Sequence, residues 1–469
     1  MTARRQPLLA AMACAALAAA CSREPPLVSM PPAGAEPTLI RAVPVFDGLA
    51  TERGAPRDVL LADGRIARIG AANSITPPPG ATVIEGAGLT LLPGLIDVHG
   101  HTGSASEPTW WGAFPDPERN LQSYLYCGVT TVLDPGGLDD ESFERRAAIA
   151  DGTLLGPTML AAGPIFTTPD GHPAALLRAL LPWYLRWYVV PHFVREVATP
   201  EEARAAVAAL AESGPDVIKI VVDAIPLPAP VIAADVARAI VEAAHARGIR
   251  AVAHIGTVED ALLAADAGVD AWMHGVYKEP IPDEIVPRLA AADIPYVATS
   301  VVFDGYADVA EGIRAPTRLE RETVAPEVLD GFAPVPEDFA PEDLTAFTRM
   351  LPATREARCE NVRRVHAAGV TVLAGADAQA GVFPGPGLHR ELAILSRCGL
   401  TNGEALRAAT GFAARFVADD PDPPYGIVAE GKVADLVLVE GDPLADIGAT
   451  ERIREVFRRG VRLERHPGI

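Results

Sequence analysis

Short apolar runs alternate with helix-like segments through the middle of the chain, between residues 93 and 418. Thr199, Pro200 and Glu202 illustrate the helix signals, because they supply an N-cap threonine, a first-turn proline and a capping-box glutamate. Thr401 and Glu404 repeat the capping box further along the chain. This alternation is typical of a parallel sheet or barrel. Eight strands over roughly 280 residues fit a (β/α)8 TIM barrel, so we expect an α/β fold of this kind. The expected strands are residues 95–99, 129–133, 159–162, 217–222, 250–254, 271–274, 296–298 and 370–374.

Both ends of the chain contain further strand patterns. Residues 39–45, 59–70 and 82–85 predict strands, with a hairpin turn at Asp63-Gly64, and residues 425–440 and 456–463 predict more. Neither set is large enough for a complete domain. We therefore expect one composite β-sandwich, formed by residues 38–92 and 419–469, beside a barrel of residues 93–418.

The first 21 residues have the features of an export signal. Arg4 and Arg5 precede an apolar stretch, residues 8–20, that is too short to span a bilayer as a helix. Residues 17–22 (LAAACS) resemble the lipobox of bacterial lipoproteins, which implies lipidation at Cys21 and, with Ser22, sorting to the outer membrane facing the periplasm. The leucine lies four rather than three residues before Cys21, so secretion to the periplasm without a lipid stays an alternative. Residues 22–37 are expected to form a linker.

The charge and composition of the chain limit the classes of function that it can have. The formal net charge is −21 and no cluster of Lys and Arg appears, which argues against a nucleic-acid partner. The 49% of apolar residues and 22% of charged residues are typical of a globular enzyme. Cys127, Cys359 and Cys398 are an odd and widely spaced set, so we expect three buried thiols rather than a disulfide framework.

Polar residues lie at or near the carboxyl ends of the expected strands, where barrel enzymes assemble their sites. Most informative is Lys219, because an ammonium in an apolar strand must be paired, shifted in pKa or chemically changed. Taken singly, Asp377 could cap a helix and each histidine could be a core or turn residue. Together they predict a metal site. The candidate ligands are His99, His101, Lys219, His254, His274 and Asp377.

Several motifs occur in a fixed order along the chain. They are residues 93–101 (PGLIDVHGH), 128–134 (GVTTVLD), 216–220 (DVIKI), 252–254 (VAH), 274–275 (HG), 374–377 (AGAD), 389–392 (HREL), 404–410 (EALRAAT), 431–437 (GKVADLV) and 441–444 (GDPL). In these motifs the chain resembles the metal-dependent hydrolases of the amidohydrolase superfamily, of the imidazolonepropionase and Xaa-Pro dipeptidase type. The resemblance covers nearly the whole chain after the signal segment.

The resemblance implies a site with two divalent ions, most often zinc. His99, His101 and Asp377 would hold one ion and His254 and His274 the other, with carbamylated Lys219 bridging both. A metal-activated hydroxide would then cleave an amide-type carbon–nitrogen bond, and Asp377 would carry the proton to the leaving nitrogen. His172, in a Gly-His loop, would contact the substrate.

The expected substrate is a small amide, with dipeptides included. A cyclic-amide hydrolase or a deaminase is the main alternative, although Lys219 weighs against the mononuclear deaminases. A ligand-binding lipoprotein without catalysis is the alternative from another class, and a homo-oligomer stays open. The aromatic residues 176–194 could form a lid, a membrane-resting surface or a packed helix. Residues 303–343 are expected to form another loop.

Overall fold

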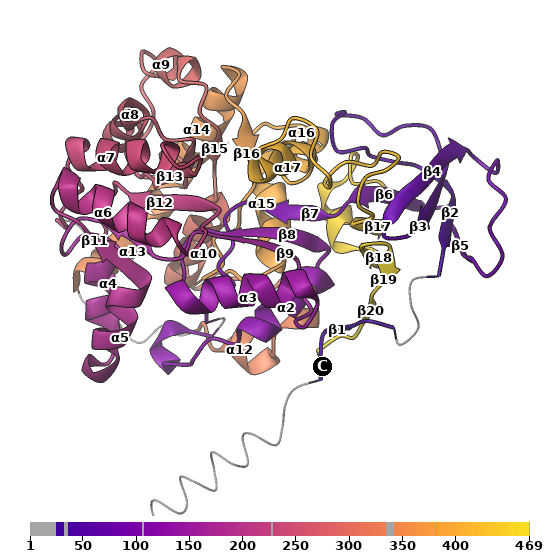
Figure 1. Cartoon of the computed structure of the whole chain (residues 1–469), viewed down its shortest axis with the longest axis horizontal. Helices are drawn as coiled ribbons and strands as arrows, with labels where there is room; N and C mark the ends of the chain where they lie inside the picture. Colours follow the sequence, from indigo (N-terminus) through magenta and orange to yellow (C-terminus); the bar gives the residue numbers. More distant parts are fainter. Residues whose placement is uncertain are drawn as a thin grey trace, which may run out of the picture.

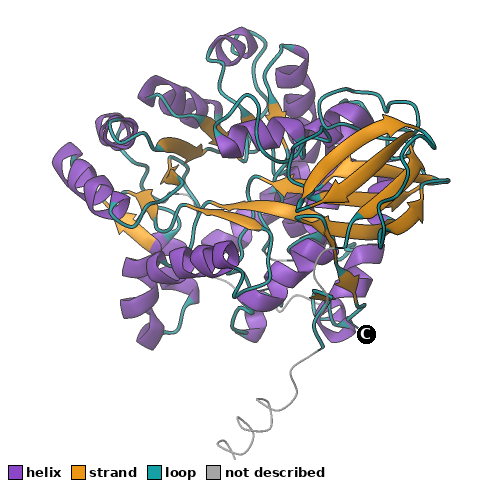
Figure 2. Cartoon of the chain, turned by 45° about the vertical axis from the view of Figure 1, so that its right-hand side comes forward, coloured by secondary structure: helices purple, strands orange, loops and turns teal. Residues whose placement is uncertain are grey.

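The computed structural model describes residues 25–31, 36–105, 107–226, 228–333, 342–379 and 381–468. The expected export signal, with Cys21, lies outside these residues. The described chain is a mixed α/β protein, in which helices surround a group of strands and a β-rich unit lies at one end (Figures 1 and 2). No helix within the described residues has the length and apolar character needed to cross a bilayer.

Two parallel sheets form the centre of the α/β part. One has the order β7 (Leu95–Asp97), β8 (Val129–Asp134), β9 (Thr158–Ala161). The other has the order β11 (Val194–Glu196), β10 (Ile165–Thr167), β12 (Val217–Val221), β13 (Arg250–His254), β14 (Ala271–Met273), β15 (Tyr296–Val297), β16 (Val372–Leu373).

Backbone hydrogen bonds link these two sheets at two places. The Asp216 amide donates to the Ala161 carbonyl over 2.9 Å beside β9 and β12, and the Val98 amide donates to the Ala374 carbonyl over 3.2 Å beside β7 and β16. One hydrophobic cluster contains buried residues from strands of both sheets, including Ile96, Val252 and Leu373. The ends of the strands are therefore held close together around a shared interior.

Each of the eight strands expected in this region is confirmed, within about two residues at either end. β7 is shorter than expected and ends at Asp97, so His99 and His101 follow the strand rather than lie in it. β10 and β11 were not expected. Each has three residues, too few for an apolar period to be read from sequence.

Helices cover the outside of the sheets in Figure 2. N-caps were predicted at Thr199 and Thr401, and both accept the backbone amide three residues on. The helices are α2 (Pro117–Tyr126), α3 (Asp139–Asp151), α4 (Ala174–Leu180), α5 (Trp183–Phe193), α6 (Pro200–Ala211), α7 (Ala234–His245), α8 (Val258–Ala267), α9 (Val286–Ala291), α10 (Ser300–Glu311), α11 (Arg318–Thr323), α12 (Pro326–Asp330), α13 (Glu342–Met350), α14 (Arg355–Ala367), α15 (Pro386–Arg397), α16 (Asn402–Ala408), α17 (Gly411–Ala418) and the 3-10 helices η1 (Thr109–Trp111), η2 (Pro352–Thr354) and η3 (Ile447–Glu451).

The prediction of a loop at residues 303–343 was wrong for most of the segment. α10, α11 and α12 occupy much of it, while residues 334–341 lie outside the described part of the chain. A capping box between Thr317 and Glu320 starts α11. Of the prolines in the described part of this segment, Pro316 lies between α10 and α11, and Pro326 lies in the first turn of α12, where proline is tolerated.

The β-rich unit contains strands from both ends of the chain. One sheet has the order β4 (Arg65–Ala71), β3 (Arg57–Ala62), β2 (Thr38–Val43), β5 (Thr82–Glu85), and the other β19 (Val461–Arg462), β18 (Ile453–Arg458), β17 (Leu436–Glu440), β6 (Leu89–Pro93). Val59, Leu91 and Leu438 belong to one hydrophobic cluster, which draws on both sheets. The hairpin predicted between β3 and β4 is confirmed, and Asp63 and Gly64 both have the positive φ that such a turn requires.

Part of the segment expected as a linker is structured. β1 (Val28–Ser29) pairs antiparallel with β20 (Glu464–Arg465), and the side chain of Leu27 is fully buried. Residues 27–29 are therefore packed against the body of the protein.

The prediction that all three cysteines are free thiols was wrong for two of them. Cys359 on α14 and Cys398 at the end of α15 form a disulfide across 39 residues, with their Cα atoms 4.9 Å apart. Sequence spacing could not reveal this pair, because the packing of α14 against α15 brings them together. Cys127 is a free, buried thiol as expected.

Candidate metal centre

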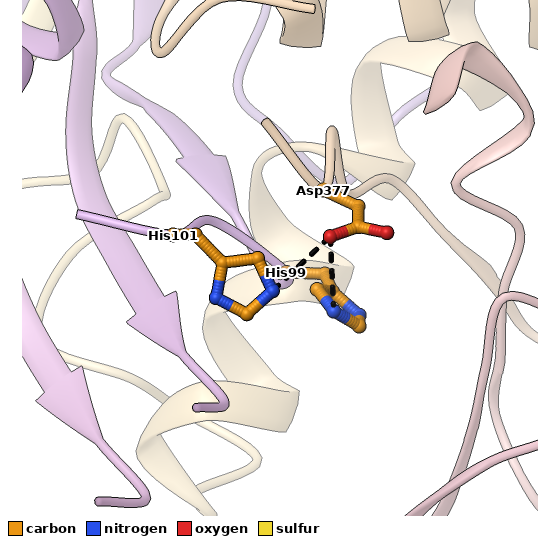
Figure 3. Close-up of side chains that lie close together, drawn as sticks. All are labelled: His99, His101 and Asp377. Carbon is orange, nitrogen blue, oxygen red and sulfur yellow. Dashed lines mark ion pairs between the residues drawn. The ribbon is translucent and has the colours of Figure 1, made fainter. Parts of the chain in front are cut away.

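Three of the expected ligands, His99, His101 and Asp377, converge just beyond the ends of β7 and β16 (Figure 3). Asp377 Oδ1 lies 3.1 Å from His101 Nε2 and 3.7 Å from His99 Nε2. One ligand atom from each residue lies within 4.8 Å of the others. Two imidazoles and a carboxylate at this spacing can hold one divalent cation.

The backbone around β7 and β16 fixes this arrangement. Asp97 Oδ1 accepts the amides of His99 and Ala376, both over 3.0 Å, and the Asp377 amide donates to the His99 carbonyl over 2.6 Å. Gly375 permits the close approach, because a Cβ there would lie 2.7 Å from that of His99. The two segments that carry the ligands are thus tied directly to each other.

His101 is positioned from its other ring nitrogen. Its Nδ1 donates to the Gly136 carbonyl over 3.2 Å and lies 3.5 Å from Asp134 Oδ1, so Nε2 points toward Asp377. Burial lowers the pKa of His101, but hydrogen bonds to Asp134 and Asp377 outweigh it and raise the pKa to about 10. Asp134 and Asp377 therefore stabilise a positive charge at His101. A bound cation would supply that charge in place of a proton on the ring.

His254 and His274 lie beside this group. The ring centroids of His254 and His274 are 4.0 Å apart, those of His274 and His99 4.4 Å apart, and His274 Nδ1 lies 3.5 Å from Asp377 Oδ2. His254 ends β13 as expected, and His274 directly follows β14. The four histidines, three of them buried and His101 partly buried, thus form a continuous group around one carboxylate.

Lys219 lies in the middle of β12, as predicted, and its side chain is buried. Among the described residues, its Nζ has no hydrogen-bond partner. Burial lowers the pKa of Lys219 to about 7. Burial and the nearby Lys219 charge both lower the pKa of His99. Lys219 is therefore a buried amine that lacks a hydrogen-bond partner and loses its proton more easily than an exposed lysine.

Asp223 was not predicted, although it organises one side of the site. This buried carboxylate accepts His254 Nε2 over 3.1 Å and the Tyr277 hydroxyl over 2.6 Å, and it also binds Lys278 Nζ. Gly256 gives it room, since a Cβ there would lie 2.5 Å from the carboxylate. Because His254 Nε2 is hydrogen-bonded to Asp223, its Nδ1 is the ring nitrogen that remains to bind a metal ion. In His274 the roles are reversed. Its Nδ1 is hydrogen-bonded to Thr299 over 2.9 Å, so Nε2 remains to bind a metal ion.

A family model described as "Amidohydrolase family" matches residues 90–463. The chain belongs to the amidohydrolase family. This amidohydrolase is 29% identical over 410 residues to an uncharacterized protein of Mycobacterium tuberculosis, with 85% of this chain and 90% of that protein covered. It is 27% identical over 412 residues to the ochratoxinase of Aspergillus niger, with 81% and 76% covered.

Solved structures show the same fold. A Xaa-Pro dipeptidase with bound methionine matches the amidohydrolase with a TM-score of 0.72 at 23% identity, covering 91% of this chain and 99% of the other. The ochratoxinase of Aspergillus niger matches with a TM-score of 0.69 at 23% identity, covering 92% and 96%. These neighbours imply a TIM-barrel-type α/β fold. The chain is an enzyme that acts on carbon–nitrogen bonds, as its family does.

Amidohydrolases generally use divalent metals, and the side chains of this site suit such ions. The donors are imidazole nitrogens and a carboxylate, which zinc accepts. The buried atoms His99 Nδ1 and Lys219 Nζ have no hydrogen-bond partner within the described chain. Unsatisfied buried polar atoms are rare in folded proteins, so their presence fits a site completed by a ligand.

His172 lies next to the group, with its ring centroid 5.3 Å from that of His254. Its Nδ1 is buried and has no partner among the described residues, and burial lowers its pKa to about 3. A neutral ring with a free nitrogen can bind a substrate group. His389 instead donates to the Cys127 carbonyl over 2.8 Å and so joins α15 to the end of α2.

Another group in the described chain, Asp139, Asp140 and His192, also has metal-ligand spacing. It is more exposed, and Asp139 already pairs with Arg195 over 2.5 Å and His192 over 3.0 Å. We therefore assign no metal to it.

Proposed function

We propose that this amidohydrolase cleaves an amide bond of a small substrate at a centre of two divalent ions, most simply zinc. The observation that carries the proposal is the convergence of His99, His101 and Asp377 beside a buried lysine that lacks a partner. His99, His101 and Asp377 would hold one ion. His254, through Nδ1, and His274, through Nε2, would hold the other.

Lys219 would bridge the two ions as a carbamate. The neutral Nζ forms a bond to the carbon of carbon dioxide and releases one proton, which leaves an anionic carbamate with two oxygens. This step needs an unprotonated amine, and the lowered pKa of Lys219 supports it. An arginine could not react in this way, because its guanidinium stays protonated.

The bound ions would polarise the substrate carbonyl and make a water acidic enough to attack it near neutral pH. Asp377 would take the proton of that water and deliver it to the leaving nitrogen. His101 and His99 lie within 3.7 Å of Asp377 Oδ1 and hold that carboxylate at the centre. His172 would contact the substrate from beside His254.

We propose, in addition, that the two parallel sheets are parts of one (β/α)8 barrel of residues 93–418. The backbone bonds at Asp216 and Val98 support this reading. The two sheets of the β-rich unit would then form one composite sandwich, from residues 38–92 and 419–469.

Dipeptides are the proposed substrate class, since a relative in fold is named a Xaa-Pro dipeptidase. Cyclic amides and amidine-like deaminase substrates are the alternatives that a substrate screen would test. A ligand-binding lipoprotein without catalysis predicts no turnover and no bound metal.

The proposed location is outside the cytoplasm, through a lipid on Cys21 in the outer membrane facing the periplasm, or free in the periplasm. The disulfide between Cys359 and Cys398 supports export, because disulfides persist in oxidising compartments.

Replacement of Asp377 by asparagine tests the mechanism. Asp377→Asn should lower kcat by about 10²–10⁴, the usual contribution of a proton-transfer group, while circular dichroism shows a retained fold. Asp139→Asn is the matched control, since Asp139 also contacts a histidine but lies outside the centre, and it should keep full activity. Metal analysis should find two ions per wild-type chain. Full turnover in Asp377→Asn, or a purified wild-type protein that binds no divalent metal, would refute the proposal.

A further inference from the structure

Four aromatic side chains are exposed on one helix, α5. The exposed fractions are 80% for Trp183, 55% for Tyr184, 75% for Trp187 and 40% for Tyr188. We call these four residues the aromatic face. Large exposed apolar surfaces of this kind mark interaction sites in soluble proteins. In Figure 1, α4 and α5 lie at the lower left edge of the molecule.

The spacing of the aromatic face along α5 makes it a single surface. Trp183 and Trp187 are four residues apart, as are Tyr184 and Tyr188, so the four side chains form two adjacent rows. Adjacent rings contact edge-on, with centroids 6.0 Å apart for Trp183 and Tyr184 and 5.9 Å apart for Trp187 and Tyr188.

Other residues hold α5 on the protein. Val190 and Val194 are buried in a small cluster with Ala174 of α4. The helix is thus secured without its aromatic face. A packed surface helix, one of the alternatives for this segment, does not account for these four side chains.

The charge around the aromatic face departs from that of the rest of the chain. Asp and Glu make up 61 of the 469 residues, yet none occurs from residue 171 to residue 195, the longest acid-free stretch of the sequence. Arg178 and Arg195, toward the ends of this stretch, pair with Glu196 and Asp139. Arg186 lies between Tyr184 and Trp187 in the sequence of α5. It is exposed and forms no ion pair within the described chain.

This chemistry matches the surface of an anionic bilayer. Tryptophan and tyrosine favour the membrane interface, where the ring is in an apolar layer and the polar atom reaches water. Arginine can extend along the same layer to a phosphate. Salt screens charges beyond about 8 Å at physiological ionic strength, so the charges close to the face matter more than the net charge of −21. Asp139, Asp170 and Glu196, which contact side chains of this segment, are each already paired with one of its basic side chains.

A second copy of the chain fits the face less well. Packing two aromatic faces together would bring two Arg186 side chains close, with no carboxylate in residues 171–195 to compensate either of them. We propose that the aromatic face of α5 docks on an anionic lipid surface. This inference does not depend on the metal centre, so the two proposals can fail separately.

Fluorescence quenching tests the docking directly. The full-length chain is reconstituted with vesicles of equal parts phosphatidylglycerol and phosphatidylethanolamine, whose acyl chains carry bromine, and compared with unbrominated vesicles. Bromine quenches only tryptophans that reach the acyl layer. We expect quenching in the wild type and the loss of at least half of it in Trp183→Phe/Trp187→Phe. Trp111→Phe is the matched control, because Trp111 is also exposed, at 47%, but lies on η1, and it should be quenched like the wild type.

Two results would overturn the proposal. One is the absence of quenching in the wild type, and the other is unchanged quenching in Trp183→Phe/Trp187→Phe. A Tyr184→Cys variant distinguishes the competing occupant. A disulfide between the introduced thiols of two chains in solution, without quenching in vesicles, would assign the face to a second copy of the chain.

Discussion

Lysine is scarce in this chain, and its positions are informative. Only Lys219, Lys278 and Lys432 occur among the 40 basic residues of the sequence. Two of the three lie at the centre, one unpaired in β12 and one bonded to Asp223. Where arginine is the usual cation, a lysine indicates a need for a small head group or a shifted pKa. This signal could have revealed Lys278 from the sequence.

Asp223→Asn should weaken metal binding. The Asp223 carboxylate accepts a hydrogen bond from His254 Nε2, which leaves Nδ1 free to bind a metal ion. The side-chain amide of an asparagine could instead donate to Nε2. The proton of the neutral ring would then move to Nδ1, which could no longer bind the ion. We expect the affinity for one of the two proposed ions to fall about 10–100-fold, measured by titration with a chromophoric zinc chelator.

Asp58→Asn is the matched control for this change. Asp58 is a buried carboxylate that accepts only backbone amides, from Ala42, Asn73 and Ile75, far from the histidines in sequence. Its variant should bind both ions like the wild type. Wild-type affinity in Asp223→Asn would remove Asp223 from the metal centre.

At the scale of elements, the disulfide joins two helices that pack against each other. Closing a loop of 39 residues should stabilise the protein by about 4 kcal/mol, mainly by restricting the unfolded chain. Cys359→Ser/Cys398→Ser should lower the free energy of unfolding in urea by up to that amount. The wild type treated with dithiothreitol should unfold at the same urea concentration as the double variant. If reductant leaves the wild-type midpoint unchanged, the two thiols are not paired.

The sequence predicted the elements of the α/β part well where they are long or chemically marked. The eight apolar runs and the capped helix starts at Thr199 and Thr401 carry local signals, and each is present. β10 and β11 are defined by their neighbours rather than by their own three residues. The helices of residues 303–330 were missed because prolines between short helices look like those of a loop.

The residues of the candidate site, too, were predicted only where the local sequence carries a signal. His99, His101 and Asp377 were predicted from strand ends, and the structure brings them together. Asp223 was missed because it follows β12 without a motif, and its importance arises from side chains 31, 54 and 55 residues away. Contacts between distant segments, like the one between Cys359 and Cys398, have no local trace in a single sequence.

At the scale of the whole molecule, a buried arginine of the β-rich unit makes hydrogen bonds to the α/β part. Arg458 of β18 binds Asp435 over 2.6 Å, and the same guanidinium donates to Thr158 Oγ1 over 2.9 Å and to the Gly156 carbonyl over 3.3 Å. Thr158 begins β9. The end of the chain is therefore tied to the start of a central strand.

Arg458→Met should destabilise the protein strongly. Burial raises the pKa of Asp435, and Arg458 opposes that effect, so losing the guanidinium leaves a buried carboxylate without a counter-charge. We expect the free energy of unfolding in urea to fall by about 3–5 kcal/mol. The double variant Asp435→Asn/Arg458→Met removes the charge as well, while the asparagine oxygen can still accept the Arg459 amide. It should recover most of the loss. If the two substitutions were instead additive, the unpaired Asp435 carboxylate would not explain the loss of stability, and the lost hydrogen bonds to Thr158 and Gly156 or the lost packing of the Arg458 side chain would account for it.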